Sequence, residues 1–212
     1  MTDESDVTKV VIVGESGVGK TCIIERFCEN TFTQATVSTI GAANASAKVT
    51  VGDTTLDLDI WDTAGQELYR SLNKIFYKNA KIAILVYDIT KKTSFEEMKN
   101  YWFEQIKKVN GDDAVIGIAG NKCDLYDKEE VSEDEAKEFA NQNDCVFQLT
   151  SAFSGSGVKE LFQLLGEKLI QKNGGPIPVE DEDNNSKKKK EKGNIKLKEQ
   201  EQKPEEHSKC CM

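Results

Sequence analysis

Gly14-Glu15-Ser16-Gly17-Val18-Gly19-Lys20-Thr21 is the stretch that decides the fold of this chain. It has the form G-x-x-x-x-G-K-T, which is typical of a loop that binds the phosphates of a nucleotide. The β-branched residues 9–13 before it indicate a buried strand, and residues 22–27 after it have apolar positions at helical spacing. Because the motif lies between a strand and a helix, a chance match in a glycine-bearing turn is disfavoured.

The motif gives its residues distinct tasks. The glycines let the backbone curl so that successive N–H groups point at a polyphosphate. The helix that follows presents its free N–H groups to the same anion. Lys20 is expected to reach the β- and γ-phosphates, and the Thr21 hydroxyl to bind Mg²⁺. The residues expected around the phosphates are Ser16, Gly17, Val18, Gly19, Lys20, Thr21 and Cys22.

Composition limits the classes of protein to consider. A chain of 212 residues forms one domain, or one domain with a tail. The net charge of −9 argues against a nucleic-acid partner. The only histidine is His207, so the six cysteines form no metal-binding pattern with histidines. No apolar run suits a signal peptide or a membrane span, and we expect a cytosolic protein with reduced thiols.

Strand and helix patterns alternate along the chain, which predicts a three-layer α/β domain. We expect a six-stranded, mostly parallel sheet with one antiparallel hairpin strand and helices on both faces. Ser94 with Glu97, and Ser132 with Glu135, have the spacing of capping boxes. The predicted strands are residues 7–13, 43–51, 54–61, 82–87, 115–119 and 145–149, and the predicted helices are residues 20–30, 69–77, 94–109, 133–141 and 157–172.

The predicted hairpin turns at Gly52 and Asp53, because glycine in the first place of a two-residue turn favours type II′. Antiparallel pairing then places Asn44 opposite Trp61, on the polar face of the hairpin. Two interpretations of Trp61 stay open. Either a neighbouring helix covers the indole, or the indole is part of a surface that binds a partner.

A second motif, Asp62-Thr63-Ala64-Gly65-Gln66, follows the hairpin. Asp62 ends a strand, where a carboxylate can hold a Mg²⁺-bound water. Gly65 gives the backbone freedom near a γ-phosphate, and Gln66 can orient a water for in-line attack. Together with the phosphate-binding loop, this motif indicates hydrolysis of a nucleoside triphosphate.

A third cluster, Gly120-Asn121-Lys122-Cys123-Asp124, indicates which base is bound. The Asp124 carboxylate can accept two hydrogen bonds from the N1–H and amine of guanine, a donor pair that adenine lacks. Asn121 is expected to tie this loop to the phosphate loop and the base, and the Lys122 stem to lie along the base. The backbone N–H groups of Ser151 and Ala152 are expected near guanine O6. An ordinary polar loop is the alternative, which the position at a strand's carboxyl end disfavours.

These motifs resemble those of Ras-type small GTPases, and within that superfamily the chain resembles the Rab family of membrane-traffic regulators. The resemblance covers residues 9–172. The stretches that resemble Rab proteins are residues 40–43 (IGAA), 59–62 (DIWD) and 85–90 (LVYDIT). The IGAA run and the GES start of the phosphate loop look most like the early-endosomal subgroup.

The resemblance implies a P-loop GTPase domain that binds GTP or GDP with Mg²⁺. In that family's pattern, Thr39 binds Mg²⁺ and senses the γ-phosphate, and Phe32 packs edge-on against the guanine. Residues 32–41 and 65–76 would be the two switches, ordered by GTP and loosened after hydrolysis.

The resemblance also implies partners and a location. The partners would be an exchange factor, a GTPase-activating protein (GAP), a GDP-dissociation inhibitor, an escort protein and effectors. We expect a monomer on the cytoplasmic face of endomembranes, such as the early endosome, with a cytosolic pool.

Three departures from the family's pattern stand out. An aromatic residue is usual at Asn44, arginine at Leu68 and lysine at Phe153. The predicted effector surface, which consists of Asn44, Trp61 and Phe76, is therefore altered.

Residues 174–212 differ from the rest and are expected to form a disordered tail after a GTPase domain of residues 1–173. The lysines of residues 187–190 are interpreted as a solubiliser or as a contact with anionic lipid. Cys210 and Cys211 resemble the Rab-type double prenylation site, and a C-a-a-X box is absent.

The sequence as a whole predicts a GTP-hydrolysing switch that recruits effectors to a membrane, with Gln66 as its catalytic residue. Intrinsic turnover is expected to be slow, on the order of 10⁻⁴ s⁻¹, because the arginine finger has to come from a partner. A GTP-binding scaffold with little turnover is one alternative, which Gln66 disfavours. A phosphate-loop kinase or ATPase is another, which Asp124 disfavours.

Overall fold

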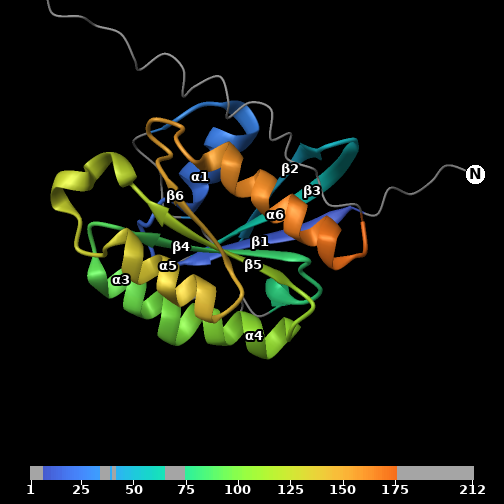
Figure 1. Cartoon of the computed structure of the whole chain (residues 1–212). Helices are drawn as coiled ribbons and strands as arrows, with labels where there is room; N and C mark the ends of the chain where they lie inside the picture. Colours follow the sequence, from blue (N-terminus) through green and yellow to red (C-terminus); the bar gives the residue numbers. More distant parts are fainter. Residues whose placement is uncertain (1–6, 34–38, 40–41, 65–74, 176–212) are drawn as a thin grey trace, which may run out of the picture. The chain divides into compact units, whose positions relative to one another are not determined.

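The computed structural model describes residues 7–33, 39, 42–64 and 75–175 of the chain, all within the unit Met1–Pro178. Strands and helices alternate along these residues (Figure 1). The strands are β1 (Thr8–Gly14), β2 (Ala42–Val51), β3 (Thr54–Thr63), β4 (Ile82–Asp88), β5 (Val115–Asn121) and β6 (Val146–Thr150). The helical segments are α1 (Lys20–Glu29), α3 (Lys92–Glu97), η2 (Met98–Phe103), α4 (Glu104–Asn110), η3 (Cys123–Lys128), α5 (Glu133–Gln142) and α6 (Val158–Lys172).

The strands form one six-stranded sheet in the order β2-β3-β1-β4-β5-β6. Only β2 and β3 pair antiparallel, and the other neighbours are parallel. The hairpin register is the predicted one, because Asn44 pairs with Trp61. Gly52 has φ 55, as the first residue of a type II′ turn requires. The predicted fold class and the predicted hairpin are both confirmed.

The strands β1, β4 and β5 are buried on both faces, because apolar residues at successive positions belong to two different clusters, whereas β2 is largely exposed. In β1, Val10 and Ile12 pack into one cluster with side chains of α1 and α6. Val11 and Val13 pack into the other with side chains of α3, η2, α4 and α5. Figure 1 shows α1 and α6 on one face of the sheet and α3, α4 and α5 on the other. In the buried strands β4 and β5, the polar residues Asp88 and Asn121 lie at the carboxyl ends.

One of the two predicted helix caps is present. Ser132 precedes α5, and its hydroxyl accepts a hydrogen bond from the Glu135 N–H at 3.2 Å. The capping box at Ser94 was a wrong prediction, because α3 already begins at Lys92. The Ser94 hydroxyl instead donates to the Lys91 carbonyl at 2.7 Å and accepts from the Asp88 N–H at 3.0 Å. This serine therefore fixes the end of β4 rather than the start of a helix.

The helix predicted over residues 94–109 runs from Lys92 to Asn110 and changes character in the middle. Its central segment, η2, is π-helical and places Trp102 fully in the core. Most of the helix predicted over residues 69–77 lies outside the described residues.

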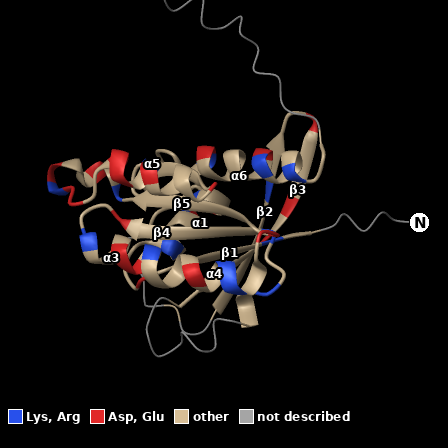
Figure 2. Ribbon diagram, turned by 60° about the horizontal axis from the view of Figure 1, so that its bottom comes forward, with Lys and Arg blue, Asp and Glu red and all other residues tan. Residues whose placement is uncertain are grey.

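Charged side chains lie mostly on the helices and loops, whereas the central strands carry few (Figure 2). Among the described residues, no helix combines the length and the apolar character that crossing a membrane requires.

Candidate functional site

The residues predicted to bind a nucleotide converge on one edge of the sheet. β1, β3, β4, β5 and β6 run parallel to one another, so their carboxyl ends lie at this edge. β1 has β3 on one side and β4 on the other, and the chain order changes direction there. Crevices of this kind outside the carboxyl ends of strands are where α/β proteins bind ligands.

The phosphate loop connects β1 to α1, and its glycines are required by its close contacts. Gly14 has φ 148, and a Cβ there would lie 2.3 Å from the Val86 carbonyl oxygen. Gly19 has φ 97, and a Cβ there would lie 2.4 Å from Asn121 Nδ2. Gly19 also precedes α1 without a side-chain cap, which leaves the first N–H groups of the helix for an anion.

Lys20 is a buried cation at the start of α1. Its ammonium donates to the carbonyls of Gly14 at 3.0 Å and Glu15 at 2.8 Å, which direct it across the loop. Burial lowers the Lys20 pKa to about 8, although the charges of Asp62 and Glu15 act in the opposite direction. The neighbours of Lys20 therefore stabilise its positive charge only in part. A bound polyphosphate would supply the missing negative charge.

Three oxygen-bearing side chains from distant parts of the chain meet beside Lys20. Asp62 Oδ2, at the end of β3, accepts from the Thr21 hydroxyl at 2.6 Å and from the Thr39 hydroxyl at 3.1 Å. The two hydroxyls lie 3.2 Å apart. These are the residues that the sequence predicted for Mg²⁺ binding.

The donor set fits a magnesium ion. The second carboxylate oxygen of Asp62, Oδ1, is buried and has no hydrogen-bond partner among the described residues. Burial raises the pKa of the Asp62 carboxyl above its ordinary value, against the hydrogen bonds of Thr21 and Thr39 and the charge of Lys20. A hard divalent cation prefers such oxygen ligands and would stabilise the ionised carboxylate.

Asn121 ends β5 and joins two loops. Its Nδ2 donates to the Val18 carbonyl in the phosphate loop at 2.8 Å. Its Oδ1 accepts from the Thr150 hydroxyl at 3.2 Å and from the Ala152 N–H at 3.3 Å. The predicted tie between this motif and the phosphate loop is present. The Ala152 N–H, which the sequence directed to guanine O6, has an internal partner here.

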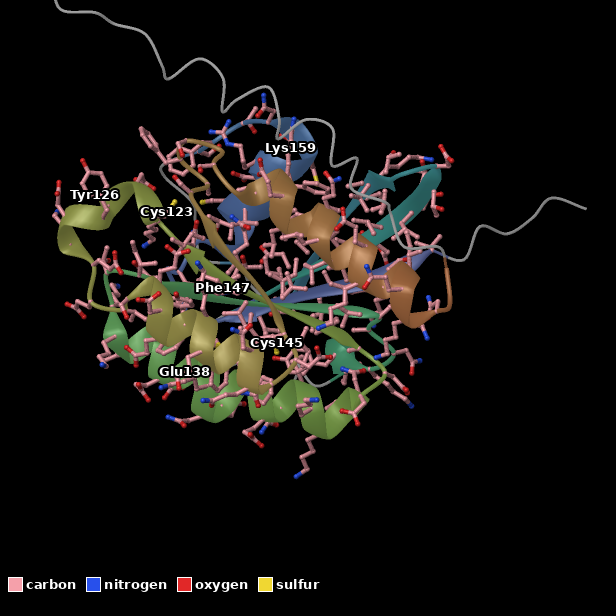
Figure 3. All side chains as sticks on the ribbon, viewed as in Figure 1. Cys123, Tyr126, Glu138, Cys145, Phe147 and Lys159 are labelled. Atoms are coloured by element: carbon pink, nitrogen blue, oxygen red, sulfur yellow. The ribbon has the colours of Figure 1, made fainter. Side chains whose placement is uncertain are left out.

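Lys122 and Asp124, which follow Asn121 in the chain, are also held by hydrogen bonds. The Lys122 ammonium donates to the Gly17 carbonyl at 2.9 Å and to Asp88 Oδ2 at 2.6 Å. Asp124 Oδ1 accepts the Ser151 hydroxyl at 2.5 Å, which orients the carboxylate. Cys123 and Tyr126, labelled in Figure 3, mark the η3 turn that follows.

Sequence reasoning missed Asp88, the buried last residue of β4. Burial alone would raise its pKa, but hydrogen bonds from Lys122 and Thr90 outweigh burial and hold the Asp88 pKa below its ordinary value. Asp88 therefore anchors Lys122 as an ion pair. The sequence feature that could have identified Asp88 is a single carboxylate at the end of an otherwise apolar strand.

The remaining predicted residues of the nucleotide site are distributed as follows. Val18 is buried in the core beneath the phosphate loop, and Ser16 and Gly17 are exposed above it. Cys22 is half-buried, with its thiol 4.0 Å from the Thr33 carbonyl. Phe32 packs beside Phe153. Gly65, Gln66, Cys210 and Cys211 lie outside the described residues.

The predicted effector surface comes together at the hairpin. Trp61 stacks on Phe76 with ring centroids 5.4 Å apart, and the Lys9 ammonium lies 5.3 Å from the indole centroid. Asp59 joins Asn44 to Trp61, because its carboxylate accepts from Asn44 Nδ2 at 2.6 Å and from the Trp61 indole N–H at 2.8 Å. The Asp59 bridge was not predicted.

Comparison with known proteins identifies the class. Residues 9–171 match the Ras family. The chain is 42% identical to the GTP-binding protein YPT52 of Saccharomyces cerevisiae over 190 residues, which cover 76% of this chain and 81% of that protein. It is 40% identical to the Ras-related protein RABF2a of Arabidopsis thaliana over 161 residues, which cover 76% of this chain and 80% of that protein.

The chain belongs to the Ras family of small GTPases, and the resemblance to its Rab members is confirmed. It binds GTP and GDP with Mg²⁺, hydrolyses GTP to GDP and acts as a nucleotide-dependent switch in vesicle traffic. Exchange factors, GAPs, GDP-dissociation inhibitors and effectors are the partners of this family in general.

Proposed function

We propose that the nucleotide state of this chain is communicated through Thr39. The supporting observation is that Thr39, from the segment between α1 and β2, hydrogen-bonds Asp62 at the end of β3. One group of oxygens thus joins the phosphate loop, the first predicted switch and the strand that leads into the second. A γ-phosphate and Mg²⁺ held there would order both segments, and hydrolysis would release them.

The residue roles that we propose follow from this edge of the sheet. Thr21, Thr39 and Asp62 would hold Mg²⁺, which would neutralise charge on the phosphates. Lys20 binds the β- and γ-phosphates, and Asp124 selects guanine. The other nucleotide contacts are Ser16, Gly17, Val18, Gly19, Cys22, Phe32, Gly65, Asn121, Lys122, Ser151 and Ala152.

Gln66 is the proposed catalytic residue. It would orient the attacking water for in-line displacement at the γ-phosphate. Intrinsic turnover would be on the order of 10⁻⁴ s⁻¹, and a GAP would supply the arginine that stabilises the transition state.

The proposed effector surface consists of Asn44, Trp61 and Phe76. Trp61 and Phe76 form a stacked aromatic pair. Beside them, Asp59 accepts a hydrogen bond from the amide of Asn44, which stands where the family's pattern has an aromatic side chain. A polar contact with the effector would therefore take the place of an aromatic one. Asn44→Phe would change which effectors bind the GTP form.

The proposed location is the cytoplasmic face of endomembranes, the early endosome in particular, with a cytosolic pool. Residues 1–173 would form the GTPase domain, and residues 174–212 a tail that ends in the lipidation site. Prenyl chains on Cys210 and Cys211 would anchor the monomer, since stable anchoring takes two signals. A GDP-dissociation inhibitor and an escort protein would handle the prenylated chain.

The assignment of the guanine site is tested by Asp124→Asn. The variant presents a donor where the carboxylate presents an acceptor, so it is expected to weaken GTP and favour xanthosine triphosphate, whose pattern is reversed. Asp127→Asn, an exposed neighbour in η3, is the matched control. Equal losses of GTP and ATP binding, or no loss, would overturn the assignment.

A further inference from the structure

Asp59 on β3 is a carboxylate whose hydrogen-bond partners are neutral groups. Its Oδ1 accepts from Asn44 Nδ2 at 2.6 Å, and its Oδ2 accepts from the Trp61 indole N–H at 2.8 Å. Asp57, two residues earlier on the same face of the strand, is instead paired with the Lys48 ammonium at 2.8 Å. Among the described residues, Asp59 takes part in no ion pair. Its negative charge is therefore not balanced by a cation in direct contact.

The contact with Asp59 also fixes which atom Asn44 presents to solvent. An ionised carboxylate can only accept hydrogen bonds, so the atom that Asn44 turns toward Asp59 has to be its amide nitrogen. The amide oxygen is then left over, and no donor from the described part of the chain reaches it. Asn44 is exposed. The surface thus offers an acceptor at Asn44 beside the charge of Asp59.

The aromatic part of the surface offers only its rings. Trp61 and Phe76 stack and both pack against the core cluster on the α3 and α5 face of the sheet, which holds them in place. The one donor of the indole is already used by Asp59. The Lys9 ammonium, which lies over the indole, donates to the Lys78 carbonyl at 3.0 Å rather than to Asp59. An apolar group therefore fits the pair better than a polar one.

We propose that the effector surface takes a partner segment that places an arginine against Asn44 and Asp59 and an apolar side chain on Trp61 and Phe76. Asp59 is the residue that determines this specificity. The proposal rests on the effector surface proposed above. A guanidinium carries several N–H donors in one plane, so it can donate to an amide oxygen and a carboxylate together and pack over the neighbouring indole. The net charge of −9 likewise favours a basic partner.

The test selects randomised peptides from a display library on the full chain, loaded with Mg²⁺ and a non-hydrolysable GTP analogue. The recovered peptides are expected to share an arginine beside an apolar residue, and to bind Asp59→Asn about fivefold more weakly. Asp57→Asn is the matched control, because Asp57 lies on the same face but has its own lysine, and it should change nothing. A pool without a shared arginine, or equal affinity for Asp59→Asn, would overturn the proposal.

A double-variant cycle tests whether the arginine contacts Asp59 directly. Citrulline, which is neutral and nearly the same shape, replaces the arginine of a recovered peptide. The exchange is expected to weaken binding about fivefold on the original chain and hardly at all on Asp59→Asn. Equal losses on both chains would place the arginine elsewhere and overturn the assignment.

Phe76→Ala separates a failure of this inference from a failure of the effector surface itself. If the recovered peptides bound a folded Phe76→Ala variant as tightly as the original chain, the proposed effector surface would be wrong. If Phe76→Ala weakened them and Asp59→Asn did not, the surface would stand and the preference for arginine would be wrong.

Discussion

The two halves of the nucleotide site are built differently. In the base half, the polar groups of Asn121, Lys122 and Asp124 have hydrogen-bond partners within the protein. In the phosphate half, Lys20 is a buried cation with a lowered pKa, and Asp62 is a buried carboxyl with a raised one and one unpartnered oxygen. The base half is therefore held in place by hydrogen bonds within the protein, whereas the charges of the phosphate half are compensated only when its ligands bind.

This difference matches the task of a switch. The base is the same in GTP and GDP, so the loops that bind it gain nothing from moving. The γ-phosphate is the part that changes, and its binding energy can order a segment only where the protein has not already satisfied its own charges. Thr39 belongs to the half that depends on the ligand.

The largest effect is expected for Lys20→Ala. Charged hydrogen bonds contribute about 1.5–3 kcal/mol each, so losing those to two phosphates should weaken GTP about 1000-fold. Affinity for guanosine, which has no phosphate, should stay the same. Isothermal titration calorimetry with both ligands measures the two effects. Lys81→Ala, at an exposed position, is the control. Equal losses for guanosine and GTP would contradict the division into halves.

A smaller effect that crosses both halves is expected for Asn121→Ala. It removes three hydrogen bonds, which join the phosphate loop, Thr150 and Ala152. At about 1 kcal/mol each, affinity should fall about 100-fold for guanosine and GTP alike. Asn143→Ala, which removes a bond to the Phe139 carbonyl elsewhere, should change neither. A loss confined to GTP would show that Asn121 belongs to the phosphate half alone.

The smallest effect is a pH dependence of GTP affinity. The Lys20 pKa is lowered to about 8, and a bound polyphosphate raises it. Below that pH the lysine is protonated in both states and affinity is flat. Above it, binding takes up a proton, and affinity falls by up to about tenfold per pH unit. Titration calorimetry near pH 9 in two buffers of different ionisation enthalpy should give proton uptake with GTP and none with guanosine. Absence of uptake would place Lys20 outside the phosphate contacts.

Much of the fold and of the nucleotide site follows from the sequence, because periodicity and turn chemistry act locally. The register of Asn44 with Trp61 was predictable since a two-residue turn fixes it. The cluster of Thr21 and Asp62 was predictable, because Thr21 follows β1, Asp62 lies near the end of β3, and the two strands are parallel. The phosphate-loop motif indicated which edge of the sheet carries the ligand-binding residues.

Other features depend on contacts between distant segments and had no local signature. Ser94 has the spacing of a cap, yet its hydroxyl turns back to β4, because the chain enters the helix two residues earlier. Arg26 reaches Ala152 and Phe153 across more than a hundred residues of sequence. The Asp59 bridge requires Asn44 from β2 beside Asp59 and Trp61 from β3, with the indole N–H directed at the carboxylate. Spacing alone specifies none of these.

Hydrogen exchange of the nucleotide-free protein, before and after addition of GDP with Mg²⁺, tests the central claim most directly. In the base half, the N–H groups of Ser151, Ser154 and Gly155 already have partners in the protein. Their protection should therefore change little, whereas the N–H groups of residues 15–21 should become strongly protected. If residues 151–155 gained as much protection as residues 15–21, the base half would not be preformed, which would contradict the difference between the two halves.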